Sequence, residues 1–255
     1  MPPPILCIGE VLWDALPAGL FLGGAPFNVA SHLHQLGEPV VIASRVGDDV
    51  LGREVLRRMR ARGMSDACVQ VDPQHRTGFV EVALNATGVP DYTIVEPAAW
   101  DAIECTEALA DQAEHARAIV FGSLAQRRSP SRETIQALWD TDAPAVFDVN
   151  LRPPFIDRAV IEPSLRAADV VKMNDEELEE MMAWFDLPSA RQAAIDALAT
   201  RFEMGVVCVT RGEHGAVLWH DGAWTEHPGY VVTVADTVGA GDAFLAGLLA
   251  AYFSG

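Results

Sequence analysis

Basic residues are scarce in this sequence. Lysine and arginine together number 18 against 36 acidic residues, which gives a formal net charge of −18. Nucleic acids and anionic membranes need a basic protein face, so both are excluded as partners. A small anionic ligand is compatible with this charge where arginines, backbone amides or a metal ion offset the background field.

Cysteines are also few, and no two of them are spaced as a CxxC pair. Cys7 and Cys208 lie in apolar, strand-like runs, which favours reduced core thiols over disulfides or metal sites. No apolar stretch approaches the roughly 18 residues of a membrane span, and the N-terminus lacks the basic and apolar regions of a signal peptide. We therefore expect a cytoplasmic protein. Internal repeats, low-complexity segments and interdomain linkers are also lacking.

What the chain does contain is a regular alternation of short β-rich runs with helical patterns over 255 residues, enough for a single α/β domain with a buried core. Such alternation predicts a mostly parallel sheet covered by helices on both faces, with ligands at the carboxyl ends of the strands. The predicted strands are 5–8, 40–43, 118–121, 145–147, 170–172 and 206–210, and the predicted helices are 28–36, 51–62, 132–139, 175–184, 190–201 and 243–253.

Two segments alternate as antiparallel hairpins instead. Residues 77–95 carry polar residues on one face, and we interpret them as a small lid, which would exclude water from a reactive site. A simple edge hairpin is the alternative interpretation. Residues 216–224, with Asp221-Gly222 at the turn, fit the edge of the main sheet.

The strongest chemical signal is the segment Asp236-Thr-Val-Gly-Ala-Gly-Asp242. Its glycine-flanked turn places Asp242 in the first turn of an apolar helix. The backbone N–H groups of Gly239, Ala240 and Gly241 would point outward at the positive end of the helix dipole, where they stabilise an anion. A carboxylate base beside a bound phosphate is the arrangement of a phosphotransferase.

A second cluster lies near the N-terminus. Gly23 and Gly24 precede a helix and would let the backbone approach a ligand, while Asn28 offers both a donor and an acceptor. Asp14, in a segment expected to be irregular, can accept hydrogen bonds from two neighbouring hydroxyls. The alternative is that the two glycines form an ordinary loop and that Asn28 is an N-cap.

Three further groups follow predicted strands. Asp148, Asn150 and Arg152 would share one side of an extended chain, so Arg152 could meet a phosphate, or the group could form a structural salt bridge. Asn174 and Glu177 have the spacing of a capping box, and a place near hydrated Mg²⁺ is the functional alternative. The stretch 210–215 is a turn by composition that could also line a nucleotide.

These motifs, taken in order, resemble the ribokinase-like (PfkB-type) carbohydrate kinases over essentially the whole chain. The segment 236–244 resembles the C-terminal signature of that family, residues 23–30 the N-terminal one, and 47–52 its glycine–aspartate segment. Phe244 stands where a Rossmann fingerprint requires a third glycine, which argues against an NAD-dependent oxidoreductase. Within the family the chain is most similar to bacterial fructokinases, in the segments Gly9-Glu10 with Asp14, Gly24-Ala-Pro-Phe-Asn28, Trp100-Asp101, Gly122-Ser-Leu-Ala-Gln-Arg127 and Asp148-Val-Asn-Leu-Arg152.

The resemblance implies a three-layer α/β/α fold with a mostly parallel central sheet, a small β lid that in many members mediates dimerisation, and phosphorylation of a sugar by ATP with Mg²⁺. It implies Asp242 as the base and the amides of Gly239, Ala240 and Gly241 as the anion hole. The other implied roles are sugar binding for Asp14, Gly24 and Asn28, sugar or phosphate contact for Arg152, Mg²⁺ and phosphate handling for Asn174 and Glu177, and nucleotide contact for Thr210, Gly212 and Gly215.

One departure from the family concerns the C-terminal end. Family members continue beyond the signature helix with a stretch that completes the adenine pocket, whereas this sequence ends at Gly255. The leading hypothesis is a fructose kinase. A kinase for another sugar, a sugar acid or a nucleoside is the nearest alternative, and an inactive sugar-binding homologue is a second one.

Overall fold

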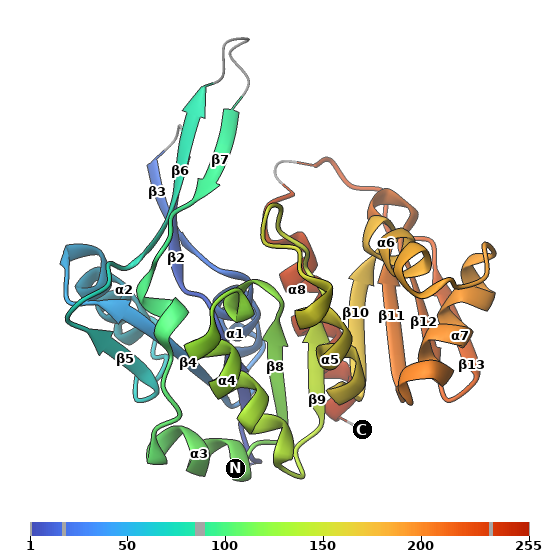
Figure 1. Ribbon diagram of the computed structural model, residues 1–255, viewed down its shortest axis with the longest axis horizontal. Helices are drawn as coiled ribbons and strands as arrows, with labels where there is room; N and C mark the ends of the chain where they lie inside the picture. The colour runs from blue at the N-terminus through green and yellow to red at the C-terminus, as the bar shows by residue number, and fades with distance from the viewer. Residues whose placement is uncertain (1, 17–18, 85–89, 235–236, 255) are drawn as a thin grey trace.

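The computed structural model describes residues 2–16, 19–84, 90–234 and 237–254 (Figure 1). The strands of the main sheet are β1 Ile5–Ile8, β4 Val40–Gly47, β5 Val69–Asp72, β8 Ala118–Gly122, β9 Ala145–Asp148, β10 Val170–Asn174, β11 Val206–Thr210, β12 Ala216–His220 and β13 Ala223–His227. Within these residues the sheet has nine strands in the order β13-β12-β11-β10-β9-β8-β1-β4-β5. The pairs from β11 to β5 are parallel, and β12 and β13 form the predicted antiparallel edge.

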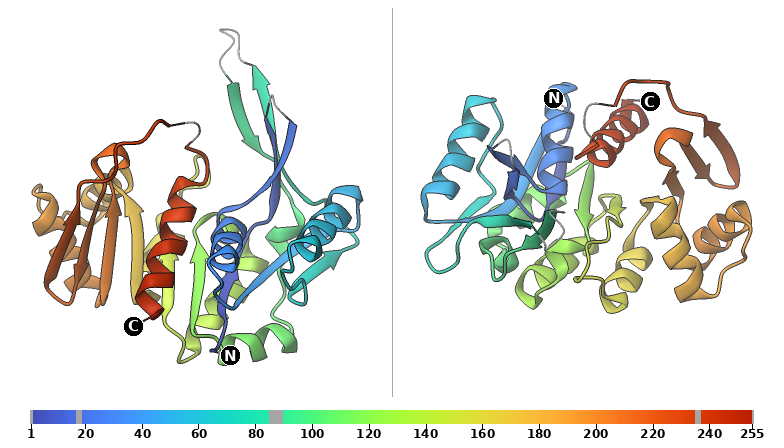
Figure 2. Two further views of the ribbon diagram at one scale, coloured as in Figure 1. Left: turned by 180° about the vertical axis from the view of Figure 1, so that it is seen from behind. Right: turned by 90° about the horizontal axis from the view of Figure 1, so that it is seen from above.

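Helices cover both faces of this sheet (Figure 2). One face carries α1 Ala25–Gln35, α2 Val50–Ala61 and α8 Ala240–Ser254, and the other carries α3 Glu107–Glu114, α4 Ser129–Ala137, α5 Arg158–Ala167, α6 Asp175–Phe185 and α7 Arg191–Phe202. Strands enclosed in this way are apolar at most positions, which is why the sequence shows them as nearly continuous apolar runs. The predicted three-layer architecture is confirmed.

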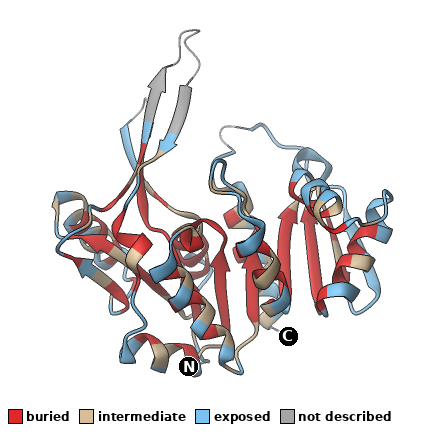
Figure 3. Cartoon of the chain, in the orientation of Figure 1, coloured by how far each residue is buried: buried red, intermediate tan, exposed pale blue. Residues whose placement is uncertain are grey.

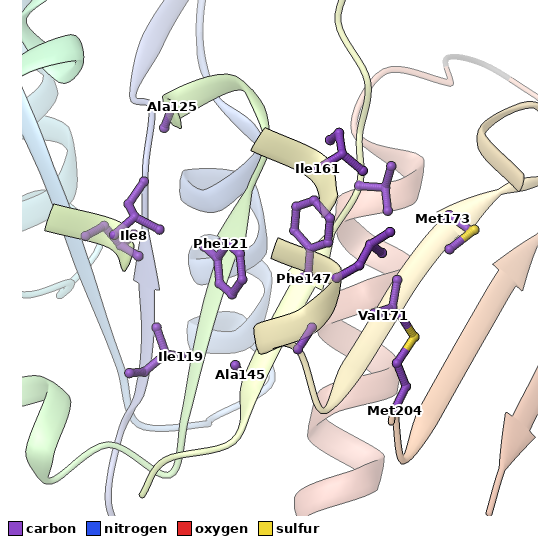
Figure 4. Close-up of a cluster of buried hydrophobic side chains, with 14 of the residues drawn as sticks. Ile8, Ile119, Phe121, Ala125, Ala145, Phe147, Ile161, Val171, Met173 and Met204 are labelled. Carbon is purple, nitrogen blue, oxygen red and sulfur yellow. The ribbon is translucent and has the colours of Figure 1, made fainter. Parts of the chain in front are cut away.

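The core lies between the sheet and these helices, and the strands are its most buried part (Figure 3). Phe121 and Phe147 stack with their ring centroids 5.2 Å apart, beside Ile161 of α5 (Figure 4). On the opposite face Leu245 and Leu249 of α8 are fully buried in one cluster with residues of α1. Each large side chain buried in this way stabilises the fold by roughly 1.5–3 kcal/mol. In the part of the chain that the structure describes, no helix is long and apolar enough to cross a membrane.

A second, smaller sheet projects from the body (Figure 1). It contains β2 Leu12–Leu16, β3 Gly19–Gly23, β6 Gly78–Leu84 and β7 Pro90–Ile94, in the order β3-β2-β6-β7. The predicted hairpin is thus confirmed in β6 and β7, although its tip, 85–89, lies outside the described residues. The expectation of an irregular segment around Asp14 is wrong, because β2 pairs with β3 and β6.

Two polar anchors hold the base of the small sheet against the body. Asp49 caps α2 through the Gly52 N–H at 2.8 Å and accepts hydrogen bonds from the N–H and Oγ1 of Thr77, at 2.9 and 2.8 Å. On the other side, buried Arg127 donates to the Val95 carbonyl and forms an ion pair of 2.7 Å with Asp101. The glycine–aspartate segment therefore fixes the start of β6.

Replacing Asp49 by alanine should destabilise the protein by about 2–4 kcal/mol, because it removes an N-cap and leaves the N–H and the hydroxyl of Thr77 without their acceptor. Urea denaturation would measure the difference. Asp48→Ala is the matched control: its carboxylate forms an exposed ion pair with Arg53, and its loss should cost no more than about 0.5 kcal/mol. Equal effects of the two substitutions would contradict the anchoring role of Asp49.

Candidate active site

Asp242 lies in the first turn of α8, at the carboxyl end of the parallel strands, and is 8% exposed. Its Oδ2 accepts a hydrogen bond of 2.8 Å from Nδ2 of Asn28, which lies in the first turn of α1. Asn28 is therefore not an N-cap, as the alternative interpretation had it; Gly24 occupies that position. The side-by-side packing of α1 and α8 fixes the carboxylate where the sequence predicts a base.

The turn before α8 differs in part from the expected anion hole. Gly239 has φ +74°, in the left-handed region that glycine tolerates. The N–H of Ala240 lies 3.2 Å from the Thr237 carbonyl and so takes part in the turn itself, whereas all three amides were expected to point outward. Asp236, at the start of the signature, lies outside the described residues.

A pocket of about 330 Å³ opens beside Asp242. Asp14, Gly24, Asn28 and Arg152, the four predicted substrate residues, all line it together with Asp242. Strands of the small sheet, with Val80 and Ile94 among their residues, form one wall of it, and helix starts and loops form the rest. We call this space the acceptor pocket.

The glycine pair before α1 has a steric reason. A Cβ at Gly23 would lie 2.5 Å from Oδ2 of Asp14, and one at Gly24 would lie 2.3 Å from the Glu10 carbonyl oxygen. Gly24 also has φ +108°. Burial raises the pKa of Asp14, and the positive charge of Arg152 opposes that rise. Because neither glycine has a Cβ, the Asp14 carboxylate and the start of α1 can pack closely together.

Glu10 also lines the acceptor pocket, and sequence reasoning gave it no role. It is 2% exposed; its Oε1 accepts a hydrogen bond of 3.2 Å from the Ala25 N–H, and its Oε2 has no partner among the described residues. Burial raises the pKa of Glu10 to about 7; Asp242 adds to the rise, while backbone N–H groups and Arg152 oppose it. The available signal was an acidic residue directly after an apolar strand.

A second hollow, of about 510 Å³, lies on the other side of the α8 N-terminus. We call it the donor groove. The predicted nucleotide residues Thr210, Gly212 and Gly215 line it together with Ala240 and Gly241. The first turn of α8 therefore separates the two spaces, with Gly239 and Asp242 on the acceptor side and Ala240 and Gly241 on the donor side.

Asn174 and Glu177 form the capping box that one interpretation foresaw. The Asn174 side chain accepts from the Glu177 N–H, and the Glu177 carboxylate accepts from the N–H groups of Asn174 and Leu151, all at 2.8 Å. Both residues line a third pocket, which meets the acceptor pocket at Arg152, and neither lines the donor groove. Both carboxylate oxygens of Glu177 are thus engaged by backbone.

Asp148, Asn150 and Arg152, which were expected to share one side of an extended chain after β9, do not do so. Asn150 has φ +39°, so the chain is not extended there and the predicted alternation fails. Asp148 forms a buried ion pair of 2.9 Å with Lys172. Arg152 is exposed at the pocket rim and has no carboxylate within ion-pair distance among the residues described. The salt-bridge interpretation thus holds for Asp148, with a different partner, and Arg152 stays available to a ligand.

Comparison with known proteins agrees with this geometry. The family described as pfkB family carbohydrate kinase matches residues 18–255. The chain belongs to this family. The fructokinase of Rhizobium leguminosarum bv. trifolii is 33% identical over 267 residues, an alignment that covers 96% of this chain and 78% of the relative. The predicted family and the predicted carbohydrate kinase are confirmed.

Solved structures show the same fold. Fructokinase from Xylella fastidiosa, crystallised with bound ATP, superposes with a TM-score of 0.85 at 25% identity and covers 98% of this chain and 81% of that one. A double mutant of the Vibrio cholerae O395 fructokinase, with fructose, ADP and potassium ion bound, gives a TM-score of 0.80 at 25% identity, with coverages of 96% and 82%. The ribokinase-like fold predicted from the sequence is thereby confirmed.

Replacing Glu10 by glutamine should remove a pH-dependent loss of stability. The pKa of Glu10 rises from an ordinary 4.5 to about 7 on folding, so the folded state binds more protons between these values and stability falls as the pH rises through them. Relative to wild type, Glu10→Gln should gain roughly 3 kcal/mol between pH 4.5 and pH 7. Denaturation across this range would show the gain. The same substitution at Glu213, whose side chain is 89% exposed, should show none.

Proposed function

We propose that this protein transfers the γ-phosphoryl group of ATP to a primary hydroxyl of a small sugar, with fructose as the acceptor and fructose 6-phosphate as the product. The observation that carries the proposal is the position of Asp242 and its turn between the acceptor pocket and the donor groove. A base on one side of a helix N-terminus and an anion site on the other are what in-line phosphoryl transfer requires. The fructokinase names of the relatives support fructose as the acceptor.

In this mechanism the Asp242 carboxylate accepts the proton of the sugar hydroxyl as the hydroxyl oxygen attacks the γ-phosphorus. A new oxygen–phosphorus bond forms, the bond to the β–γ bridging oxygen breaks, and ADP leaves with that electron pair. The hydrogen bond from Asn28 holds Oδ2, which leaves Oδ1 for the incoming hydroxyl. Catalysis is then mainly positioning and stabilisation of charge.

Mg²⁺ would neutralise charge on the phosphates of the donor. The described residues contain no group of three or more histidine, cysteine, aspartate or glutamate side chains that could hold a metal ion. Glu177 already accepts hydrogen bonds at both oxygens. These residues therefore fit a Mg²⁺ ion bound chiefly by phosphate and water, with Asn174 and Glu177 shaping the backbone nearby.

The small sheet serves in this proposal as a lid over the acceptor, supported by the places of Val80 and Ile94 in the pocket wall. Exposed Leu20 and Phe21 on β3 support a homodimer through this sheet. Cytoplasmic location remains a prediction from the sequence.

An ADP-release assay on this chain, with Mg-ATP and a panel of sugars, sugar acids and nucleosides, tests the proposal. Turnover with fructose far above the other acceptors is the expected result. Preferential turnover with another acceptor would overturn the assignment of fructose as the substrate but would still support a kinase. No turnover with any of them, alongside calorimetric sugar binding, would support an inactive sugar-binding homologue.

Substituting Asp242 by asparagine should lower kcat by about 10²–10⁴-fold, because the proton acceptor is lost. Sugar affinity should stay within about threefold, since the amide oxygen can still accept the hydrogen bond from Asn28. Steady-state kinetics and calorimetry separate the two effects. Asp221→Asn, at an exposed hairpin turn, controls for the change of charge. Unchanged turnover of Asp242→Asn would refute the role of the base.

For Asp14→Ala the main loss should be in sugar binding. A carboxylate that accepts hydrogen bonds from sugar hydroxyls contributes about 1.5–3 kcal/mol, which corresponds to a rise of about 10–100-fold in the dissociation constant. Calorimetric titration with fructose measures it, and ADP affinity serves as the internal control. An unaltered sugar affinity would remove Asp14 from the acceptor site.

A further inference from the structure

Lys172 is a buried lysine directly beneath the candidate site. It pairs across the sheet with Asp148 of β9 and with Cys208 of β11. Neighbours in register on parallel strands point to the same face, and here that is the face that α8 covers. Lys172 lines neither the acceptor pocket nor the donor groove.

The ammonium group lies against the turn that separates these two spaces. A Cβ built on Gly241 would be 3.0 Å from Nζ of Lys172. The lysine is 5% exposed, and among the described residues its Nζ donates one hydrogen bond, of 2.9 Å, to Oδ1 of Asp148. The second oxygen of Asp148 has no partner there. A side chain at residue 241 would thus push against the ammonium, so glycine at this position lets the charge approach the turn.

The lysine is charged in this place. Burial lowers its pKa, but the carboxylates of Asp148, Glu177 and Asp242 outweigh burial, and the net shift is upward. A cation at the positive end of a helix dipole is unfavourable by itself. A buried ion pair is also a poor source of stability, because apolar residues of similar size often serve the fold as well or better. Stability alone therefore does not account for a lysine here.

A bound anion above the turn would make a positive charge at this position favourable. A phosphoryl group on the donor side would meet the N-terminus of α8 and, beneath it, a full positive charge shielded from water. Both act most strongly where the dielectric is low. In a chain with a net charge of −18, a cation fixed at this point would offset part of the repulsion that the incoming phosphates meet.

We propose that Lys172, held by Asp148, is a positioning residue for phosphoryl transfer that acts through the Ala240–Gly241 turn on the group passing from ATP to the acceptor. This inference rests on the proposed function. It adds a buried charge to the backbone amides that the sequence motif supplies. The positive charge of Lys172 would stabilise the transferring phosphoryl group more than the sugar or ADP, because the lysine lies beneath the turn that separates the acceptor pocket from the donor groove.

The double variant Lys172→Met with Asp148→Asn tests the proposal. Removing the lysine alone would leave a buried carboxylate without its partner, whereas the double variant removes both charges and should fold as stably as wild type. A purely structural pair would then leave catalysis intact. The matched control is Arg117→Met with Glu38→Gln, which removes a half-buried ion pair near the amino ends of the strands, away from the site.

We expect the double variant to lose about 100-fold in kcat, with the KM for fructose within about threefold of wild type. By calorimetry, ADP should bind within about threefold of wild type, while the β,γ-methylene analogue of ATP should bind about tenfold more weakly. The control variant should match wild type in each measurement. A stable double variant with wild-type kcat and an unchanged ratio of analogue to ADP affinity would overturn the proposal.

Failure of the proposed function can be told apart from failure of this inference. If wild type phosphorylates none of the acceptors, the kinase proposal fails, and the ratio of analogue to ADP affinity alone decides the role of Lys172. A selective loss of analogue binding then supports the lysine, and equal losses for both nucleotides overturn it. If the double variant does not fold, Lys172→Gln, which removes the positive charge but keeps a hydrogen-bond donor for Asp148, is compared by the same ratio of analogue to ADP affinity and decides in the same way.

Discussion

The hydrogen bond between Asn28 and Asp242 joins side chains that lie 214 residues apart, and the site depends on it. It forms only if α1 and α8 start side by side on one face of the sheet. That in turn requires the strand order of the main sheet, in which β8 alone separates β1 from β9 and the other strands of the C-terminal half. The buried apolar faces of the two helices set this contact, and the polar pair at their N-termini converts it into an oriented carboxylate. Folding energy and catalytic geometry thus come from the same packing.

Charge is the second constraint on the site. Glu10, Asp14 and Asp242 line the acceptor pocket, and Asp148 lies behind the turn of α8. Such crowding disfavours ionisation, which is part of the reason why the pKa of Glu10 is raised. It also repels phosphate. Two positive charges, exposed Arg152 at the pocket rim and buried Lys172, would offset this repulsion of phosphate. The N-terminus of α8 adds a partial positive charge.

Local patterns made most of the fold, and the position of Asp242 at the start of a helix, predictable. Parallel strands buried on both faces read as apolar runs, and the glycine turn before Asp242 is contiguous in sequence. Pairing between distant segments was not predictable in the same way: β2 pairs not only with β3, its neighbour in sequence, but also with β6, which comes much later in the chain. The predicted alternation after β9 failed at Asn150, because a left-handed backbone, which asparagine tolerates, does not show in the alternation of apolar and polar residues. Glu10 was missed because burial, which gives it an unusual pKa, appears only in three dimensions.

The acceptor pocket is a composite of regions far apart in the chain. Asp14 comes from the first fifty residues, Ile94 from the small sheet, Arg152 from the loop after β9 and Asp242 from the last helix. A shift of the small sheet would therefore open the wall at Ile94 without moving the base. The anchors at Asp49 and Arg127 lie outside the pocket, yet they set the position of that wall. The wall that the small sheet contributes to the acceptor pocket is thus carried by other elements than Asp242, whereas Asn28 ties the remaining wall directly to that carboxylate.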